Sequence, residues 1–404
     1  MPPNDERKSV TPTDRNNWKR ADLVDDERGR GFPAVVRYGP YFFVSGSDGH
    51  RRLSDERIDP ESAENADTQC RNSYGRVARR LEKAGYGGDC AVWIENFTSG
   101  QHWRLQRMGL WPEYFGEENH QQAVSFGAQT RMHGINMLTS VVLAMDPSLP
   151  RKVAVKPPGR GRASRITRVG PLVFVIGVRG HEDPRTGAVA PEESDDAFDA
   201  QLDNCIHALA AHLSKDGTPM DNVVRMDATL RAARFVPHYE ERLRTHFGGK
   251  IPFASYAVGT PLGARLEQEI GCVAVVDAAE KKILWSDAQS GVADVCVGGG
   301  LAFVRNVSGI VDESTGKMRE GIHGDGKAQA RQAMRNVEAL LGKAGVGPDK
   351  LLRLDIFLKD IYAQDEVLTE LKSVWGRSVP ALSFLGCDTR HGAEIEITAL
   401  AGAK

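Results

Sequence analysis

The hydrophobic residues in the middle of the chain follow two periods, one typical of strands and one typical of helices. Residues 170–187 are rich in Val, Phe and Ile and end in Gly/Asp turn residues, which predicts a hairpin. A strand over 223–230, a helix over 237–247 and a strand over 267–276 follow further along. The order ββαβαβ predicts an α+β domain with helices on one face of a mixed sheet. The first helix of this order is amphipathic, with apolar residues at helical spacing: Phe198, Leu202, Cys205, Ile206, Leu209 and Leu213.

The same order of elements occurs three times, with a nearly constant spacing between matching residues. Ser125 and Ser255 are 130 positions apart, and the Gly-His pairs at 49–50 and 180–181 are 131 apart. In the third copy we expect a strand over 351–358, a helix over 364–375 and a strand over 394–400. Chance matches would not keep this register across several motifs, so the sequence predicts three tandem copies of one domain. Four pairs from the second and third copies are 128 positions apart: Asp221 and Asp349, Arg225 and Arg353, Pro252 and Pro380, Ser255 and Ser383.

The repeats also predict where the domains begin and end. We expect the first domain, which is the most divergent copy, over 31–148, the second over 149–280 and the third over 281–404. Residues 1–30 are expected to be a tail, either disordered or strapped along the body. The segment 147–164 is rich in Pro, Gly and Arg, which predicts a linker.

Composition excludes several classes of protein. The chain has 404 residues and a net charge of −2, which fits several domains and gives no reason to expect a nucleic-acid partner. None of its six cysteines forms a CxxC pair, and no histidines with metal-ligand spacing lie beside them, so we expect no disulfide framework, metal or other cofactor. No apolar run approaches the roughly 18 residues of a membrane span. With a polar N-terminus, these features predict a cytoplasmic protein without a membrane partner.

Four features together resemble the RidA (YjgF-type) family of enamine and imine deaminases. They are the D-x-x-T-G turns at 183–187 and 312–316, the helix leading to an AG-turn-D strand, the P-x-x-S segments, and the closing EIEITALA at 394–401. The resemblance implies a chorismate-mutase-like fold. It also implies a trimer with ligand sites in the clefts between subunits. Three copies in one chain would then form an intramolecular pseudo-trimer. Whether two such chains pair is left open.

The resemblance implies a particular set of catalytic residues. Family members hold the substrate carboxylate with an arginine two residues after the proline of P-x-R-S, and a glutamate on the last strand places the attacking water. The arginine position is occupied by Val124, Ala254 and Leu382 in the three copies. The glutamate matches Glu269 and Glu396 in the second and third copies.

Other polar residues near these positions are candidates to replace the arginine. The loop before the last strand of each copy carries an arginine, and in two copies a histidine that titrates near neutral pH. We expect His391 to be catalytic beside the two glutamates. The candidates for substrate binding, on this loop, on the P-x-x-S segment and at the end of the hairpin, are Arg131, His133, Arg265, Arg390, Ser255, Ser383, Asp48, His50, Arg179 and His181.

Three functions are compatible with this set of residues. The first is a metal-independent hydrolase of a small, anionic enamine, imine or related C–N compound, acting in a cleft between domains. The second is chorismatase-like cleavage of a cyclic carboxylate, because the Gly-His pairs ending at His50 and His181 are similar to a chorismatase segment. The third is a metabolite-binding protein without catalysis, which the loss of the arginine in all three copies favours.

Overall fold

The structure is a computed structural model, and its described part is mixed α and β with three six-stranded sheets. None of the described helices combines the length and the apolar character needed to cross a membrane. The structure describes residues 18–55, 57–62, 65–98, 110, 113–116, 122–127, 137–155, 166–192, 195–260, 262, 266–285 and 291–403.

The first sheet has the strand order β1-β2-β3-β6-β4-β5. Strands β4 and β5 are parallel, and the other neighbours are antiparallel. Helix α1 packs on β3 and β6. The elements are β1 (Arg20–Asp25), β2 (Pro33–Tyr38), β3 (Tyr41–Asp48), α1 (Ala66–Lys83), β4 (Ala91–Thr98), β5 (Gln122–Gly127) and β6 (Met137–Met145).

The second and third sheets repeat this topology, in the orders β7-β8-β9-β12-β10-β11 and β13-β14-β15-β20-β18-β19. Helices α3 and α5 take the place of α1 on them. The elements of the second domain are β7 (Arg151–Val155), β8 (Ile166–Val169), β9 (Leu172–Arg179), α3 (Asp195–Asp216), β10 (Val223–Leu230), α4 (Val236–His246), β11 (Ala254–Gly259) and β12 (Gln268–Val275). Those of the third domain are β13 (Lys282–Trp285), β14 (Ala293–Gly298), β15 (Leu301–Ser308), β16 (Val311–Asp312), β17 (Lys317–Met318), α5 (Gly326–Lys343), β18 (Leu351–Leu358), α6 (Gln364–Trp375), β19 (Ala381–Gly386) and β20 (Ile395–Gly402).

The predicted α+β class is confirmed, and each six-stranded sheet has two more strands than the four of the predicted ββαβαβ order. Strands β10 and β18 and helix α6 have the bounds that the hydrophobic pattern predicts. The P-x-x-S segments of the second and third domains lead into the added strands β11 and β19, which pair in parallel with β10 and β18. The hairpin expected over 170–187 instead has its turn at 170–171 and pairs β9 with the preceding strand β8.

The other added strand of each domain comes from a segment that was not expected to be regular. Strand β1 lies within the expected tail, and β7 lies within the expected linker. Both pair antiparallel at the edge of a sheet, as β13 does in the third domain. The first sheet therefore begins before residue 31, and the segment 147–164 is in part a strand.

A close approach between strand and helix recurs in each domain and explains a repeated glycine. Gly49, Gly180 and Gly309 each follow the strand under the first helix. A Cβ atom at Gly180 would lie 1.8 Å from the carbonyl oxygen of Gln201 in α3, and the other two glycines face the equivalent glutamine of α1 and α5. The glycine is therefore required by packing.

We expect Gly180→Ala to lower the free energy of unfolding by about 1–3 kcal/mol, because helix and strand must move apart. Denaturant unfolding at neutral pH measures this change. The matched control is Gly342→Ala on the exposed face of α5, where an added Cβ would meet nothing within 4 Å. This control should stabilise the helix by roughly 0.5–1 kcal/mol. Equal stability of the two variants would contradict the packing argument.

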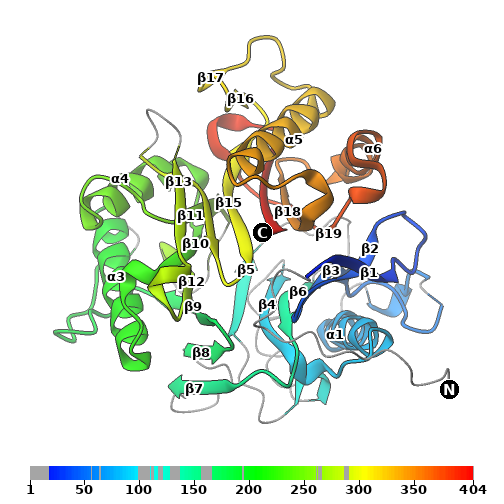
Figure 1. Ribbon diagram of the computed structural model, residues 1–404, viewed down its shortest axis with the longest axis horizontal. Helices are drawn as coiled ribbons and strands as arrows, with labels where there is room; N and C mark the ends of the chain where they lie inside the picture. The colour runs from blue at the N-terminus through cyan, green and yellow to red at the C-terminus, as the bar shows by residue number, and fades with distance from the viewer. Residues whose placement is uncertain are drawn as a thin grey trace.

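The three domains contact one another in cyclic order. Strand β5 lies beside β9, β11 beside β15, and β19 beside β3. Figure 1 shows the sheets gathered around the middle of the molecule, with α1, α3 and α5 towards the outside. One apolar core contains buried side chains from all three domains, among them Phe43, Phe174 and Phe303. The inner faces of the three sheets therefore meet and bury one another.

Candidate functional site

Five charged side chains are buried where the three domains meet. They form the central charge cluster: Glu95, Arg225, Asp227, Arg353 and Asp355. Arg225 Nε donates to Asp227 Oδ1 at 2.7 Å, and Arg353 Nη2 donates to Asp355 Oδ1 at 2.6 Å. Arg225 Nη2 also lies 3.9 Å from Asp355 Oδ2. This last ion pair joins the second domain to the third.

Strand geometry places these side chains on one face. Side chains two positions apart on a strand share a face, and β10 and β18 each carry an Arg-x-Asp pair there. Strand β4 has Trp93 and Glu95 at the matching positions. The guanidinium of Arg225 lies over the rings of Trp93 and Tyr256, 5.0 and 5.1 Å from their centroids. Tyr256 Oη donates to Glu95 Oε1 at 3.5 Å, which links the first domain to the second.

The central charge cluster has an excess of carboxyl groups, three against two guanidinium groups. The pKa of Glu95 is raised to about 8, first by burial and then by the carboxylates of Asp355 and Asp227. The pKa of Asp227 is raised to about 6, because burial outweighs the attraction of Arg225. Glu95 therefore holds a proton at neutral pH.

We expect this proton to make stability depend on pH. An unfolded glutamate ionises near pH 4.5, whereas folded Glu95 keeps its proton until about pH 8. Stability should therefore fall as pH rises from 4.5 to 8, by up to about 1.4 kcal/mol for each pH unit. Glu95→Gln should lose the part of this dependence above about pH 6, beyond the range in which Asp227 contributes, as measured by denaturant unfolding. The control Glu82→Gln, on the exposed face of α1, should behave as the unchanged protein. Parallel curves for all three proteins would contradict the assignment.

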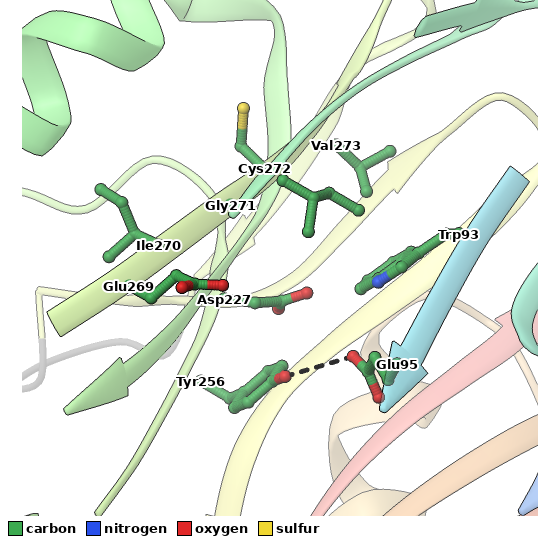
Figure 2. Close-up of a pocket in the computed structure, with 10 residues that line it drawn as sticks. Trp93, Glu95, Asp227, Tyr256, Glu269, Ile270, Gly271, Cys272 and Val273 are labelled. Carbon is green, nitrogen blue, oxygen red and sulfur yellow. Dashed lines mark hydrogen bonds between the residues drawn. The ribbon is translucent and has the colours of Figure 1, made fainter. Parts of the chain in front are cut away.

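A pocket lies beside the central charge cluster, between the first and second domains (Figure 2). Its empty volume is about 280 Å³, part of it open to solvent, and its enclosed part has room for about one water molecule. Among the described residues, no three His, Cys, Asp or Glu side chains are grouped so as to hold a metal ion. The pocket is lined by Trp93 and Glu95 of β4, Ile176 of β9, Asp227 of β10, Tyr256 of β11, and Glu269, Ile270, Gly271, Cys272 and Val273 of β12.

Glu269 is the glutamate that the sequence predicted, and it lines this pocket. Its Oε2 accepts a hydrogen bond from Arg179 Nε at 2.8 Å, on the neighbouring strand β9. A register shift between Ile270 and Cys272 marks a β-bulge at this point, and Gly177 on β9 has a φ of +76°. Bulges re-aim side chains next to active sites, which fits a glutamate directed into the pocket.

The second predicted glutamate, Glu396, has a different environment. Its Oε1 accepts a hydrogen bond from Arg390 Nε at 2.6 Å, and its Oε2 lies 3.4 Å from the Arg390 backbone nitrogen. Arg390 Nη1 also lies 3.6 Å from Glu240 Oε1 in the second domain. The structure thus pairs two predicted residues at the boundary of the second and third domains. Both carboxylate oxygens of Glu396 contact Arg390, which also forms the ion pair with Glu240 between the two domains.

The predicted serines, Ser255 and Ser383, lie in strands β11 and β19, which contact the neighbouring domains. Ser383 is buried, and its Oγ accepts a hydrogen bond from Arg353 Nη2 at 2.8 Å. Ser255 Oγ lies 3.4 Å from Tyr239 Oη. Neither serine lines the pocket beside Glu269.

His50, His181, His391 and Asp48 do not line the pocket. His50 is buried with its Nδ1 3.3 Å from Ser62 Oγ, and Asp48 lies 3.3 Å from Arg28. His181 is half-buried, and His391 is exposed with a φ of 53° in the turn Arg390–Gly392. Three other candidates fall outside the described residues: Arg131, His133 and Arg265.

Of the described lining residues only Glu269 was predicted, and the aromatic and acidic ones that were missed are Trp93, Glu95, Asp227 and Tyr256. A signal for part of this set was present, because Asp227 and Asp355 repeat the same 128-residue spacing as the arginines two positions before them. Charged residues inside otherwise apolar strands are rarely buried without a partner. That pattern could have identified the central charge cluster, although not the pocket.

Comparisons with known proteins agree with the fold. Residues 303–403 match the family model described as Endoribonuclease L-PSP. A Rid-family protein of known structure from Yersinia pestis is 24% identical, covers 30% of this chain and 99% of its own, and has a TM-score of 0.28. A YjgF-family protein from Mycobacterium tuberculosis is 24% identical over 30% of this chain and 99% of its own, with a TM-score of 0.26.

A chorismatase structure is similar over a larger part of the chain. It covers 78% of this chain and 93% of its own, at 14% identity and a TM-score of 0.50, so the likeness is one of fold. A search of curated proteins gives no match. The matched family model covers most of the third domain, and the first two domains repeat its topology. The third domain is therefore similar to the RidA (YjgF-type) family, and the other two sheets share its topology.

Proposed function

We propose that the chain is a metal-independent hydrolase of small C–N double-bonded compounds, acting in the pocket between the first and second domains. The observation that carries the proposal is the position of Glu269. It lines a pocket that is partly open to solvent and whose enclosed part has room for about one water molecule, together with two carboxyl groups whose pKa values are raised. Carboxyl groups with pKa values shifted apart by their environments are the usual basis of acid and base roles in one site.

The arrangement supplies what hydrolysis of an imine needs. Arg179 orients the Glu269 carboxylate through a hydrogen bond, and Glu269 accepts a proton from water as the water oxygen attacks the imine carbon. A protonated carboxyl group of the pocket gives its proton to the imine nitrogen, and a carbinolamine results. The proton on Glu269 then moves to the nitrogen, the donor takes back the hydroxyl proton, and the C–N bond breaks. The products are a carbonyl compound and ammonia.

The three-domain chain fits this proposal as a covalent trimer. Cyclic contacts between the sheets support an intramolecular pseudo-trimer with three boundaries. The residues at these boundaries differ. Arg179 pairs with Glu269 at one boundary, and Arg390 pairs with Glu396 at another. We infer that the chemistry is concentrated at the first of these. The residues that favoured chorismatase-like cleavage, His50 and His181, do not line the pocket, so that function is not proposed.

The test measures the hydrolysis of imines that a flavin oxidase generates in the same reaction mixture. Such an oxidase releases an imine from a primary amine and a 2-imino acid from an amino acid. Semicarbazide competes for the free imine, so an active hydrolase lowers the yield of semicarbazone. We expect a decrease that grows with the concentration of the protein. An unchanged yield for both kinds of imine would reject the hydrolase, and would favour the metabolite-binding alternative if small ligands raise the melting temperature.

A further inference from the structure

The lining of the pocket disfavours a negatively charged group. Glu95, Asp227 and Glu269 contribute three carboxyl groups. Among its described lining residues there is no Lys, Arg or His. A carboxylate beside the C=N carbon would therefore meet carboxyl groups without a cation of the described lining to compensate it, which is costly where water is excluded.

Two arginines beside this lining are already paired with its carboxyl groups. Arg179 donates to Glu269. Arg225 donates to Asp227, does not line the pocket, and lies over the rings of Trp93 and Tyr256. Neither occupies the place that the family arginine would take, since that position is the buried Ala254 in the second domain.

The central charge cluster favours a ligand group that is positively charged or can accept a proton. With three carboxyl groups against two guanidinium groups, one carboxyl group is balanced only by a proton or by a cation. Glu95 lines the pocket and belongs to the cluster, so it can pass its proton to a ligand nitrogen while the resulting ion pair keeps the same total charge. The raised pKa of Glu95 fits this role at neutral pH.

Trp93 gives an independent indication of a ligand. It is 2% exposed, and its Nε1 has no hydrogen-bond partner among the described residues. Figure 2 shows this nitrogen on the side of the ring that is turned towards Asp227. An indole N–H only donates, so it calls for an oxygen acceptor in the pocket. The oxygen of the attacking water, which becomes the carbinolamine hydroxyl, is such an acceptor.

We propose that the pocket selects imines without a carboxylate next to the C=N carbon, and that Glu95 of the first domain donates the proton to their nitrogen. This inference rests on the proposed hydrolase function. The proton of Glu95 forms the new N–H bond, and the Glu95 carboxylate then pairs with the nitrogen cation. Glu269 takes the proton of the attacking water. The proton on Glu269 then moves to the nitrogen, and as the C–N bond breaks ammonia leaves and Glu95 recovers a proton from the carbinolamine hydroxyl.

A competition between two probes tests the selectivity with the unchanged full-length chain. One is the imine from a simple primary amine, and the other is the 2-imino acid with the same side chain. We expect kcat/KM for the carboxylate-free imine to be higher by at least about tenfold. Equal values, or a preference for the 2-imino acid, would overturn the inference while leaving the hydrolase function in place. Hydrolysis of neither probe would instead reject the proposed function itself.

The role of Glu95 has its own readout. For the unchanged chain we expect kcat to fall above about pH 8, as Glu95 loses its proton. Glu95→Gln should have a lower kcat without this alkaline decline, whereas Glu82→Gln should keep the full profile. A purely structural role would alter stability and leave the shape of the pH profile unchanged. An alkaline decline that persists in folded Glu95→Gln would therefore overturn Glu95 as the donor.

Discussion

Replacing Glu269 by glutamine is expected to lower kcat/KM for imine hydrolysis by about 10²–10⁴-fold, the usual contribution of a general base. Glutamine keeps the shape of the side chain and its contact with Arg179, but it cannot take a proton from water. The loss should appear mainly in kcat, because Glu269 acts on the attacking water and the substrate is bound by the whole pocket. The assay is semicarbazone competition with the imine from a primary amine.

Glu396→Gln is the matched comparison for this prediction. Glu396 holds the same position on β20 as Glu269 on β12 and is likewise paired with an arginine, but it does not line the pocket. We expect this variant to keep most of the activity, provided that circular dichroism shows it folded. Full activity of Glu269→Gln, or a larger loss from Glu396→Gln, would place the chemistry at another boundary.

Arg353→Met is expected to lower the free energy of unfolding by about 3–5 kcal/mol, the cost of breaking a buried ion pair from one side. Arg353 is fully buried and donates to Asp355, to Ser383 and to the carbonyl oxygen of Val44 in the first domain. Within the described part of the chain, its loss would leave Asp355 with the more distant Arg225, 3.9 Å away, as its cationic partner. It would also remove a hydrogen bond across the boundary of the third and first domains.

Urea unfolding of the full-length chain at pH 7 measures this effect. The control is Arg335→Met on the exposed face of α5, which should change stability by less than about 0.5 kcal/mol. Equal midpoints for the two variants would show that the central charge cluster does not hold the domains together. A lower midpoint for Arg353→Met, with the fold retained, would support its role at the boundary.

Sequence patterns were sufficient for the elements with a clear period. Strands β10 and β18 and helix α6 follow their hydrophobic pattern without interruption, and their bounds agree with the predicted ones. The edge strands β1 and β7 were missed because they are short and rich in charge, as RADLVD and RKVAV show. Edge strands often have this composition, since charged side chains discourage pairing with other molecules. Only the neighbouring strand of the folded sheet identifies such segments as strands.

Only site residues whose position is fixed within a single domain could be predicted from the sequence. Glu269 followed from the family resemblance, because its position is fixed within one copy. Glu95 did not, because it lies in the most divergent domain and enters the pocket only when the first domain packs against the second. The pairing of Arg390 with Glu396 was within reach, since the two residues are close in sequence. Contacts that depend on domain packing could not be read from the order of the residues.

The most direct test of the central claim is a crystal structure of the full-length chain with a small primary amide. Its C=O and NH2 groups resemble the adduct of water and an imine, and it is not expected to react. We predict that the amide lies in the pocket between the first and second domains. There its NH2 group should be within hydrogen-bond distance of Glu95, and its oxygen near Trp93 Nε1 and Glu269. An amide bound instead beside Arg390 and Glu396, or at another boundary of the domains, would contradict the account.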